Sequence, residues 1–143
     1  MKHVSAYLIA ITAAWVVAQG AKFLIGSIRN QGPIDYRRLY SSGNMPSGHS
    51  ATVIALVTVI GLKMGVESAS FGIATLFAAI VMYDAIMVRR STGEQGVAIQ
   101  ELIKEQKSTV NLPRAAKGHQ PLEVAVGALI GLIVGLLVFF VTR

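Results

Sequence analysis

The amino-acid sequence predicts an all-α protein, an integral membrane helical bundle of about four transmembrane helices. The chain has 143 residues, of which 53% are hydrophobic and only 14% are charged. A soluble domain carries about 25% charged residues, so lipid rather than water is expected around much of this chain. Four stretches are apolar over about the length that one membrane crossing requires, roughly 20 residues. No strand-like alternation competes with these helices, and we expect a single membrane-embedded domain over residues 1–143.

The four apolar stretches cover about residues 4–28, 50–66, 69–88 and 122–141. The first is longer than the apolar part of a signal peptide, which has roughly 7–15 residues, so we interpret it as a membrane helix. The second and third are joined by only a few residues. The last has no charged residue after Glu123 and is the clearest of the four.

The two long connections predict how the chain is oriented in the membrane. They span residues 29–49 and 89–120 and carry nine Lys and Arg residues, whereas the opposite side carries three. Because cytoplasmic connections are enriched in Lys and Arg, we expect both long connections in the cytoplasm and the protein in the cell membrane. The nine are Arg29, Arg37, Arg38, Arg89, Arg90, Lys104, Lys107, Arg114 and Lys117, and the three are Lys2, Lys63 and Arg143.

The composition also excludes several kinds of chemistry and favours one kind of partner. The chain has no cysteine, which excludes disulfides, thiol nucleophiles and Cys-based metal sites. Its net charge is +6, but the basic residues flank apolar stretches. We therefore expect anionic membrane lipids as partners and no nucleic acid.

The second long connection contains a helical pattern of its own. Ala98, Ile99, Leu102 and Ile103 recur at helical spacing, with polar residues between them. This pattern predicts a short amphipathic helix that lies on the membrane surface, although packing against the bundle would give the same pattern.

Lys22 and Arg29 form the first of several polar clusters near the cytoplasmic end of the apolar stretches. In an α-helix, seven residues turn through about 700°, so the two side chains lie within roughly 20° of one face. Two cations on one face can bind a dianion, and polar groups in a membrane helix are functional candidates by default. The alternative is that both side chains only reach toward lipid headgroups.

The second cluster is the segment Gly-Asn-Met-Pro-Ser-Gly-His-Ser at residues 43–50, directly before the second apolar stretch. Ser47 can cap the following helix, whose free N–H groups and positive dipole end suit a phosphate. His49 would lie on the first turn, where it can donate a proton. The alternative is a loop and cap with a surface histidine.

The third cluster, residues 118–123, directly precedes the last apolar stretch. Pro121 suits the first position of a helix. Glu123 follows His119 by four residues and can reach back to the imidazole, where a carboxylate fixes the tautomer and stabilises the charged form. The alternative is that Glu123 only caps the helix.

A looser set of charged residues, Asp84, Arg89 and Arg90, ends the third apolar stretch. Arginine can bind phosphate oxygens with two parallel hydrogen bonds. We expect Asp84 to hold one of these cations in place, and a purely structural ion pair is the alternative.

Together these clusters resemble the type 2 phosphatidic acid phosphatase and vanadium haloperoxidase superfamily, in its small divergent branch. That superfamily has the pattern Lys-x6-Arg-Pro, then Pro-Ser-Gly-His, then Ser-Arg-x5-His-x3-Asp. This chain has Lys22-x6-Arg29, then Pro46 to His49, then His119-x3-Glu123, in the same order. The resemblance covers nearly the whole chain.

The chain departs from the superfamily pattern at several points. Asn30 replaces the proline, Glu123 replaces the aspartate, and no Ser-Arg directly precedes His119. The resemblance implies that Arg89 or Arg90 supplies the missing guanidinium, with Arg114 as a further candidate. The superfamily usually has six membrane helices, so a four-helix site would be shallower, or would be completed by a second subunit in a homo-oligomer.

The resemblance implies a metal-independent lipid-phosphate phosphatase that acts through a phosphohistidine and uses no cofactor. His119 would be the nucleophile oriented by Glu123, and His49 the acid and base. The phosphate would be bound by Lys22, Arg29, Arg89 or Arg90 and by the backbone at Ser47 and Gly48. The substrate would be a phosphomonoester or diphosphate on a lipid, such as phosphatidate, phosphatidylglycerophosphate or an isoprenoid phosphate.

Other interpretations of the same residues stay open. A catalytically inactive protein could keep the phosphate pocket and serve as a lipid-phosphate-binding or scaffolding protein. A small transporter or channel subunit is disfavoured, because the charges gather at one end of the spans. Gly127, Gly131 and Gly135 permit close helix packing, either within the chain or between two copies.

Overall fold

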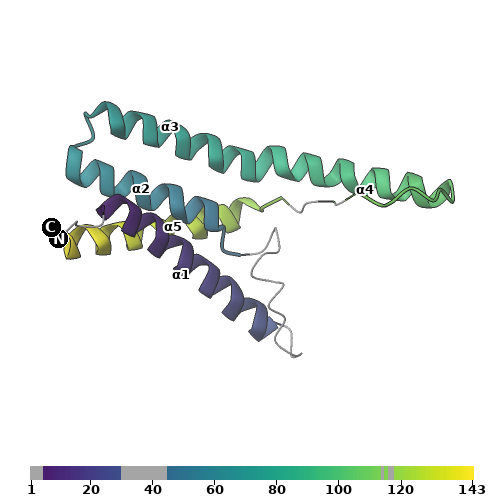
Figure 1. The fold of residues 1–143 in the computed structure, drawn as a ribbon, viewed down its shortest axis with the longest axis horizontal. Helices are drawn as coiled ribbons and strands as arrows, with labels where there is room; N and C mark the ends of the chain where they lie inside the picture. The colour runs from purple at the N-terminus through teal and green to yellow at the C-terminus, as the bar shows by residue number, and fades with distance from the viewer. Residues whose placement is uncertain (1–4, 30–44, 114, 116–117) are drawn as a thin grey trace.

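The structure is a computed structural model that describes residues 5–29, 45–113, 115 and 118–143. Its regular elements within these ranges are all helical, which confirms the predicted all-α fold (Figure 1). In chain order they are α1 (Ala6–Arg29), α2 (Gly48–Met64), α3 (Ala69–Tyr83), the π-helical segment η2 (Asp84–Val88), α4 (Arg89–Glu105) and α5 (Pro121–Val141).

The helices have the lengths and compositions of a membrane bundle. Among the described residues, three runs are long and apolar enough to cross a membrane: Ala6–Ile28, Ala69–Glu105 and Pro121–Val141. The 17-residue helix α2 is also apolar, and it is about 26 Å long at 1.5 Å per residue. A helix of that length nearly spans a hydrocarbon core of about 30 Å, so the fold is a membrane bundle of about four helices.

One helical run is much longer than the sequence predicted. Helices α3, η2 and α4 form one continuous helix of 37 residues, about 55 Å, and α4 extends away from the bundle (Figure 1). The prediction of a separate short helix on the membrane surface is therefore corrected. The physical reason is that residues 84–92 contain neither proline nor glycine, so nothing ends the helix where its apolar part ends.

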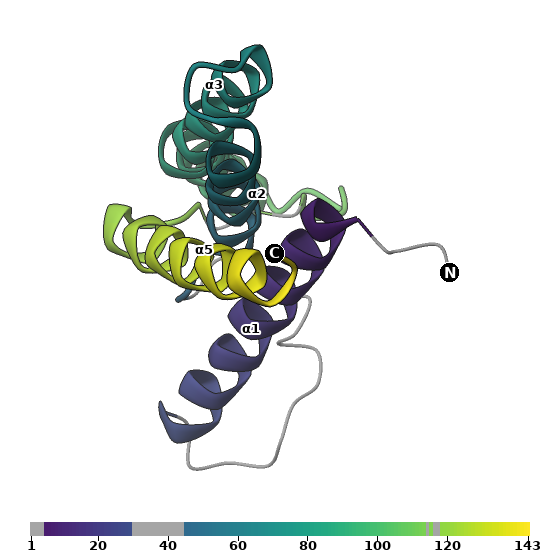
Figure 2. The same cartoon turned by 90° about the vertical axis from the view of Figure 1, so that its left-hand side faces the viewer.

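The core of the bundle consists mainly of small side chains. Helix α2 lies at the centre and contacts α1, α3 and α5 (Figure 2). Many large apolar side chains point outward, as expected for a bundle that faces lipid, while small residues allow the helix backbones to approach closely. The buried core cluster is Ala10, Ala14, Ala18, Ala51, Ala55, Val59 and Val134.

The glycine stripe on α5 packs within the chain, against α2. A Cβ at Gly127 would collide with the carbonyl oxygen of Ser47, and a Cβ at Gly131 with that of Ala51. At Gly135 it would lie 2.8 Å from Cβ of Thr58. All three glycines therefore allow α5 to lie directly on the backbone of α2. Of the two alternatives that the sequence left open, the stripe packs within the chain rather than between two copies.

The short connection between α2 and α3 lies at the same end of the bundle as the start of α1 and the end of α5 (Figure 1). Gly65 ends α2 with a φ of 84°, a conformation that residues with a side chain rarely adopt. The side chain of Ser68 then caps α3 by accepting a hydrogen bond from the backbone N–H of Phe71 at 3.2 Å. The starts of α2 and α5, which hold the predicted site residues, lie away from this turn.

Candidate functional site

The start of α2 is fixed by buried hydroxyl groups and by a bond to α5. Ser47 is the N-cap, as predicted, and its hydroxyl accepts hydrogen bonds from the backbone N–H of Ser50 at 3.4 Å and from the Ser50 hydroxyl at 2.9 Å. Both serines are completely buried. The backbone N–H of Ser47 donates to the carbonyl oxygen of Glu123 at 3.0 Å. The two predicted clusters, far apart in sequence, are therefore joined directly.

His119 and Glu123 form the pair that their spacing predicted. Nδ1 of His119 lies 2.8 Å from Oε2 of Glu123. The side chains are only 6% and 17% exposed, so water competes little for this bond. Because an ionised carboxylate only accepts hydrogen bonds, it selects the tautomer with a proton on Nδ1 and a lone pair on Nε2. Glu123 also forms a capping box with Gln120, so the alternative role as a helix cap is fulfilled by the same side chain.

The backbone of His119 is held by the π-helical segment η2. Its N–H donates to the carbonyl oxygen of Ala85 at 3.0 Å. A π-helical turn changes the hydrogen-bond register of a helix, and such turns are frequent at functional sites. Next to it, a Cβ on Gly118 would lie 2.5 Å from the backbone N and Cα of Arg90, so only glycine lets the chain pass there. These contacts fix His119 against the long helix.

Charged side chains from separate helices lie near His49. Lys22 of α1, Asp84 of η2, Arg89 of α4 and His119 all lie close enough to His49 to interact with it electrostatically. Lys22 interacts in the same way with Glu123. Residues from the three predicted motifs and from the end of the third apolar stretch therefore converge on one region.

Each of the two neighbouring arginines makes an ion pair. Nε of Arg89 lies 2.6 Å from Oδ2 of Asp84, which is the pairing that the sequence predicted for Asp84. Nε of Arg90 lies 3.1 Å from Oε1 of Glu94.

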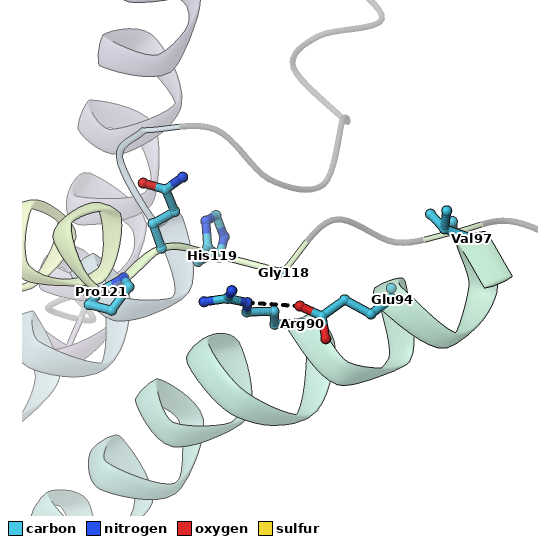
Figure 3. Close-up of a pocket in the computed structure, with 9 residues that line it drawn as sticks. Arg90, Glu94, Val97, Gly118, His119 and Pro121 are labelled. Atoms are coloured by element: carbon cyan, nitrogen blue, oxygen red, sulfur yellow. Dashed lines mark hydrogen bonds and ion pairs between the residues drawn. The ribbon is translucent and has the colours of Figure 1, made fainter.

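A cavity of about 700 Å³ opens beside His119, between α4 and the segment that leads into α5 (Figure 3). Its wall contains Arg90, Glu94 and Val97 on one side and Gly118, His119 and Pro121 on the other. This volume falls in the usual range for small-molecule sites, about 300–1,000 Å³.

Some predicted residues cannot be placed. Arg29 is the last residue of α1, and its side chain lies outside the described residues, as does all of Arg114.

Gly48 is the first residue of α2, and no atom of a neighbouring element lies within 4 Å of where a Cβ at this position would be. In the described part of the chain, no three His, Asp or Glu residues are arranged to hold a metal ion.

Sequence reasoning assigned no role to four residues of this region: Ser50, Ala85, Glu94 and Gly118. Glu94 follows Arg90 by four residues, a spacing that could have indicated the ion pair. Ser50 follows Ser47 by three residues at a helix start, which could have indicated the hydroxyl contact. The roles of Ala85 and Gly118 depend on backbone contacts between distant segments, for which the sequence contains no signal.

The fold and the site define an integral membrane protein whose helices bring a histidine–carboxylate pair together with several cationic side chains. The model of the Divergent PAP2 family matches residues 4–134, and the chain belongs to this family. The chain is also 36% identical, over 148 aligned residues and 93% of each chain, to the uncharacterized membrane protein YuiD of Bacillus subtilis (strain 168). No solved structure matches the chain. The membership confirms the resemblance that the sequence motifs indicated.

Proposed function

We propose that the protein is a membrane phosphatase that hydrolyses a phosphomonoester or diphosphate on a lipid through a phosphohistidine. The observation that carries this proposal is the contact of 2.8 Å between Nδ1 of His119 and the Glu123 carboxylate. This contact leaves Nε2 as a nucleophile, in the way that a carboxylate prepares a catalytic imidazole in other hydrolases. Membership of the Divergent PAP2 family supports the same class of reaction.

The proposed reaction has two steps. In the first, Nε2 of His119 forms a bond to phosphorus while the bond from phosphorus to the lipid oxygen breaks, and His49 donates a proton to that oxygen. In the second, His49 removes a proton from a water molecule, which attacks phosphorus and releases His119 and inorganic phosphate. His49 lies near enough to His119 for the two to interact electrostatically, which supports this division of roles.

Positive charge would stabilise the phosphoryl group in both steps. Lys22 and Arg89 are near His49, and Arg90 shares the cavity with His119. Arg29 and the backbone N–H groups at the start of α2, near Ser47 and Gly48, are further candidates. Fixed cations and dipoles contribute most of the catalysis in phosphoryl transfer, so this set supports a mechanism in which no metal ion takes part.

The position of the site supports a lipid as substrate. The site lies where α2 and α5 begin, so a lipid in the adjacent leaflet would present its headgroup at the same depth. Phosphatidate, phosphatidylglycerophosphate and isoprenoid phosphates all carry a suitable phosphate group.

The test is phosphate release by the purified, detergent-solubilised protein from a panel of these lipids, with EDTA present throughout. We expect release from at least one lipid and none from a His119→Ala variant. If folded wild-type protein releases no phosphate from any lipid of the panel, the proposal is wrong. The lipid-phosphate-binding or scaffolding role would then be the better account.

Glu123→Gln is expected to lower turnover by about 10²–10⁴-fold, while the protein stays folded. A glutamine can turn its amide N–H toward Nδ1 of His119, which moves the imidazole proton to Nε2 and removes the nucleophile. In the wild-type protein one oxygen, Oε2 of Glu123, contacts both Nδ1 of His119 and the backbone N–H of Gln120. A glutamine oxygen in that position would keep both contacts but remove the negative charge that stabilises the charged imidazole, so either orientation of the amide lowers turnover. Initial rates on the best lipid measure the effect, and wild-type rates in the variant would show that Glu123 is only a cap.

We further propose that the site faces the cytoplasm. Because the chain has no cysteine, single cysteines can report its orientation. A membrane-impermeant maleimide is expected to label Glu67→Cys in intact cells, but Lys107→Cys only after the cells are opened. The reverse labelling pattern would place the site on the outer face.

A further inference from the structure

Arg89 and Arg90 are anchored in the same manner, each by an acidic residue of the same continuous helix. In both pairs the carboxylate accepts from Nε of the arginine, at 2.6 Å for Asp84 and at 3.1 Å for Glu94. A guanidinium group bonded through Nε can still donate from its terminal nitrogens, whose fork geometry matches phosphate oxygens. The long helix therefore presents two oriented guanidinium groups.

The two groups face different parts of the candidate site. Arg89 interacts with His49, whereas Arg90 lines the cavity beside His119. The guanidinium of Arg90 lies between Glu94 and the start of α5, with its terminal nitrogens toward the side of His119 and Pro121 (Figure 3). Gly118 packs closely against the backbone of Arg90. Because His119 directly follows Gly118, this contact fixes the spacing between Arg90 and His119.

We infer that Glu94 is a positioning residue, which holds Arg90 so that its terminal nitrogens bind a phosphate dianion beside His119. This inference rests on the proposed function and adds a residue that belongs to none of the three motifs. An arginine side chain loses much rotamer freedom when it binds a ligand. Glu94 orders the side chain before the phosphate arrives, so less of that loss accompanies binding.

The direction in which phosphate affinity changes when Glu94 is removed distinguishes a positioning role from a purely electrostatic one. Glu94 is itself negative, so removing its charge near an anion site should tighten phosphate binding if Glu94 acts by charge alone. If Glu94 positions Arg90, its removal should weaken binding instead. The side chain of Glu94 is 68% exposed, so its truncation is not expected to disturb the fold.

The experiment compares Glu94→Ala with Glu101→Ala, a control on the exposed surface of the same helix. Orthovanadate, a phosphate analogue, is titrated into each purified protein, and KM and kcat are measured on the best lipid. We expect Glu94→Ala to weaken orthovanadate binding and raise KM by about threefold to tenfold, the factor for ordering one long side chain. Glu101→Ala should change neither value, and Glu94→Gln, which keeps an acceptor for Nε, should restore most of the affinity.

A double variant tests whether the effect passes through Arg90. In an Arg90→Gln background, Glu94→Ala should weaken orthovanadate binding no further. Unchanged or tighter binding by the single Glu94→Ala variant would overturn the inference, whatever the turnover. Weaker orthovanadate binding in a protein that releases no phosphate would support the inference and refute the phosphatase. A wild-type protein that binds no orthovanadate would overturn the inference, whereas the phosphatase is refuted only if no lipid of the panel releases phosphate.

Discussion

Replacement of His119 by asparagine is expected to lower phosphate release by at least about 10³-fold, which corresponds to about 4 kcal/mol of transition-state stabilisation. Asparagine can place an amide N–H near the position of Nδ1 and so keep the hydrogen bond to Glu123. It has no counterpart of Nε2, so no bond to phosphorus can form. The variant therefore removes the proposed nucleophile and keeps the contact that orders the start of α5.

The measurement for His119→Asn is the initial rate of phosphate release with EDTA present, beside the wild-type protein and His119→Ala. Elution volume and thermal unfolding in the same detergent serve as controls for the fold. In wild-type protein, rapid acid-free denaturation during turnover should trap phosphate on a histidine, and the variant should trap none. Wild-type turnover by folded His119→Asn would refute the proposed mechanism.

Replacement of Gly131 by alanine is expected to have the largest effect on stability, a loss of about 1–3 kcal/mol in the free energy of unfolding. The added methyl group would collide with the backbone carbonyl of Ala51, which cannot turn away as a side chain can. Helix propensity alone would favour alanine by about 1 kcal/mol. A net loss in the free energy of unfolding would therefore come from the close contact between α2 and α5.

Gly72→Ala provides the matched control for Gly131→Ala. Gly72 also lies in a membrane helix, α3, but nothing lies within 4 Å of where its Cβ would be. We expect this variant to unfold at the wild-type temperature or slightly above it. If Gly131→Ala is as stable as Gly72→Ala but changes the oligomeric state in crosslinking, the stripe would pack between copies and the arrangement of α5 on α2 would be wrong.

The site depends on a network that combines local and long-range contacts. The bond from Glu123 to His119 is local, because four residues along the chain bring the two side chains together. The bond from the Ser47 N–H to the Glu123 carbonyl is long-range and needs the glycine contacts between α2 and α5. Stability of the bundle and geometry of the site are therefore coupled, and Gly131→Ala should also lower activity.

The sequence by itself determined the class of fold and the members of the motifs. A continuous apolar stretch of membrane length is stable in lipid as a helix, because a helix satisfies all of its backbone polar groups within the one segment. Spacings within one helix also follow from the sequence, because helical geometry is fixed. The cap at Ser47, the helix start at Pro121 and the pair of His119 with Glu123 were predicted for that reason, and the structure has all three.

Only the tertiary structure decided how the motifs meet. The π-helical turn that receives the N–H of His119 and the contact of Gly118 with Arg90 both depend on how separate segments pack. The sequence offered Arg89 and Arg90 as equivalent candidates. The structure distinguishes them, because consecutive residues on a helix point about 100° apart, and packing places His49 near Arg89 and the cavity beside His119 near Arg90.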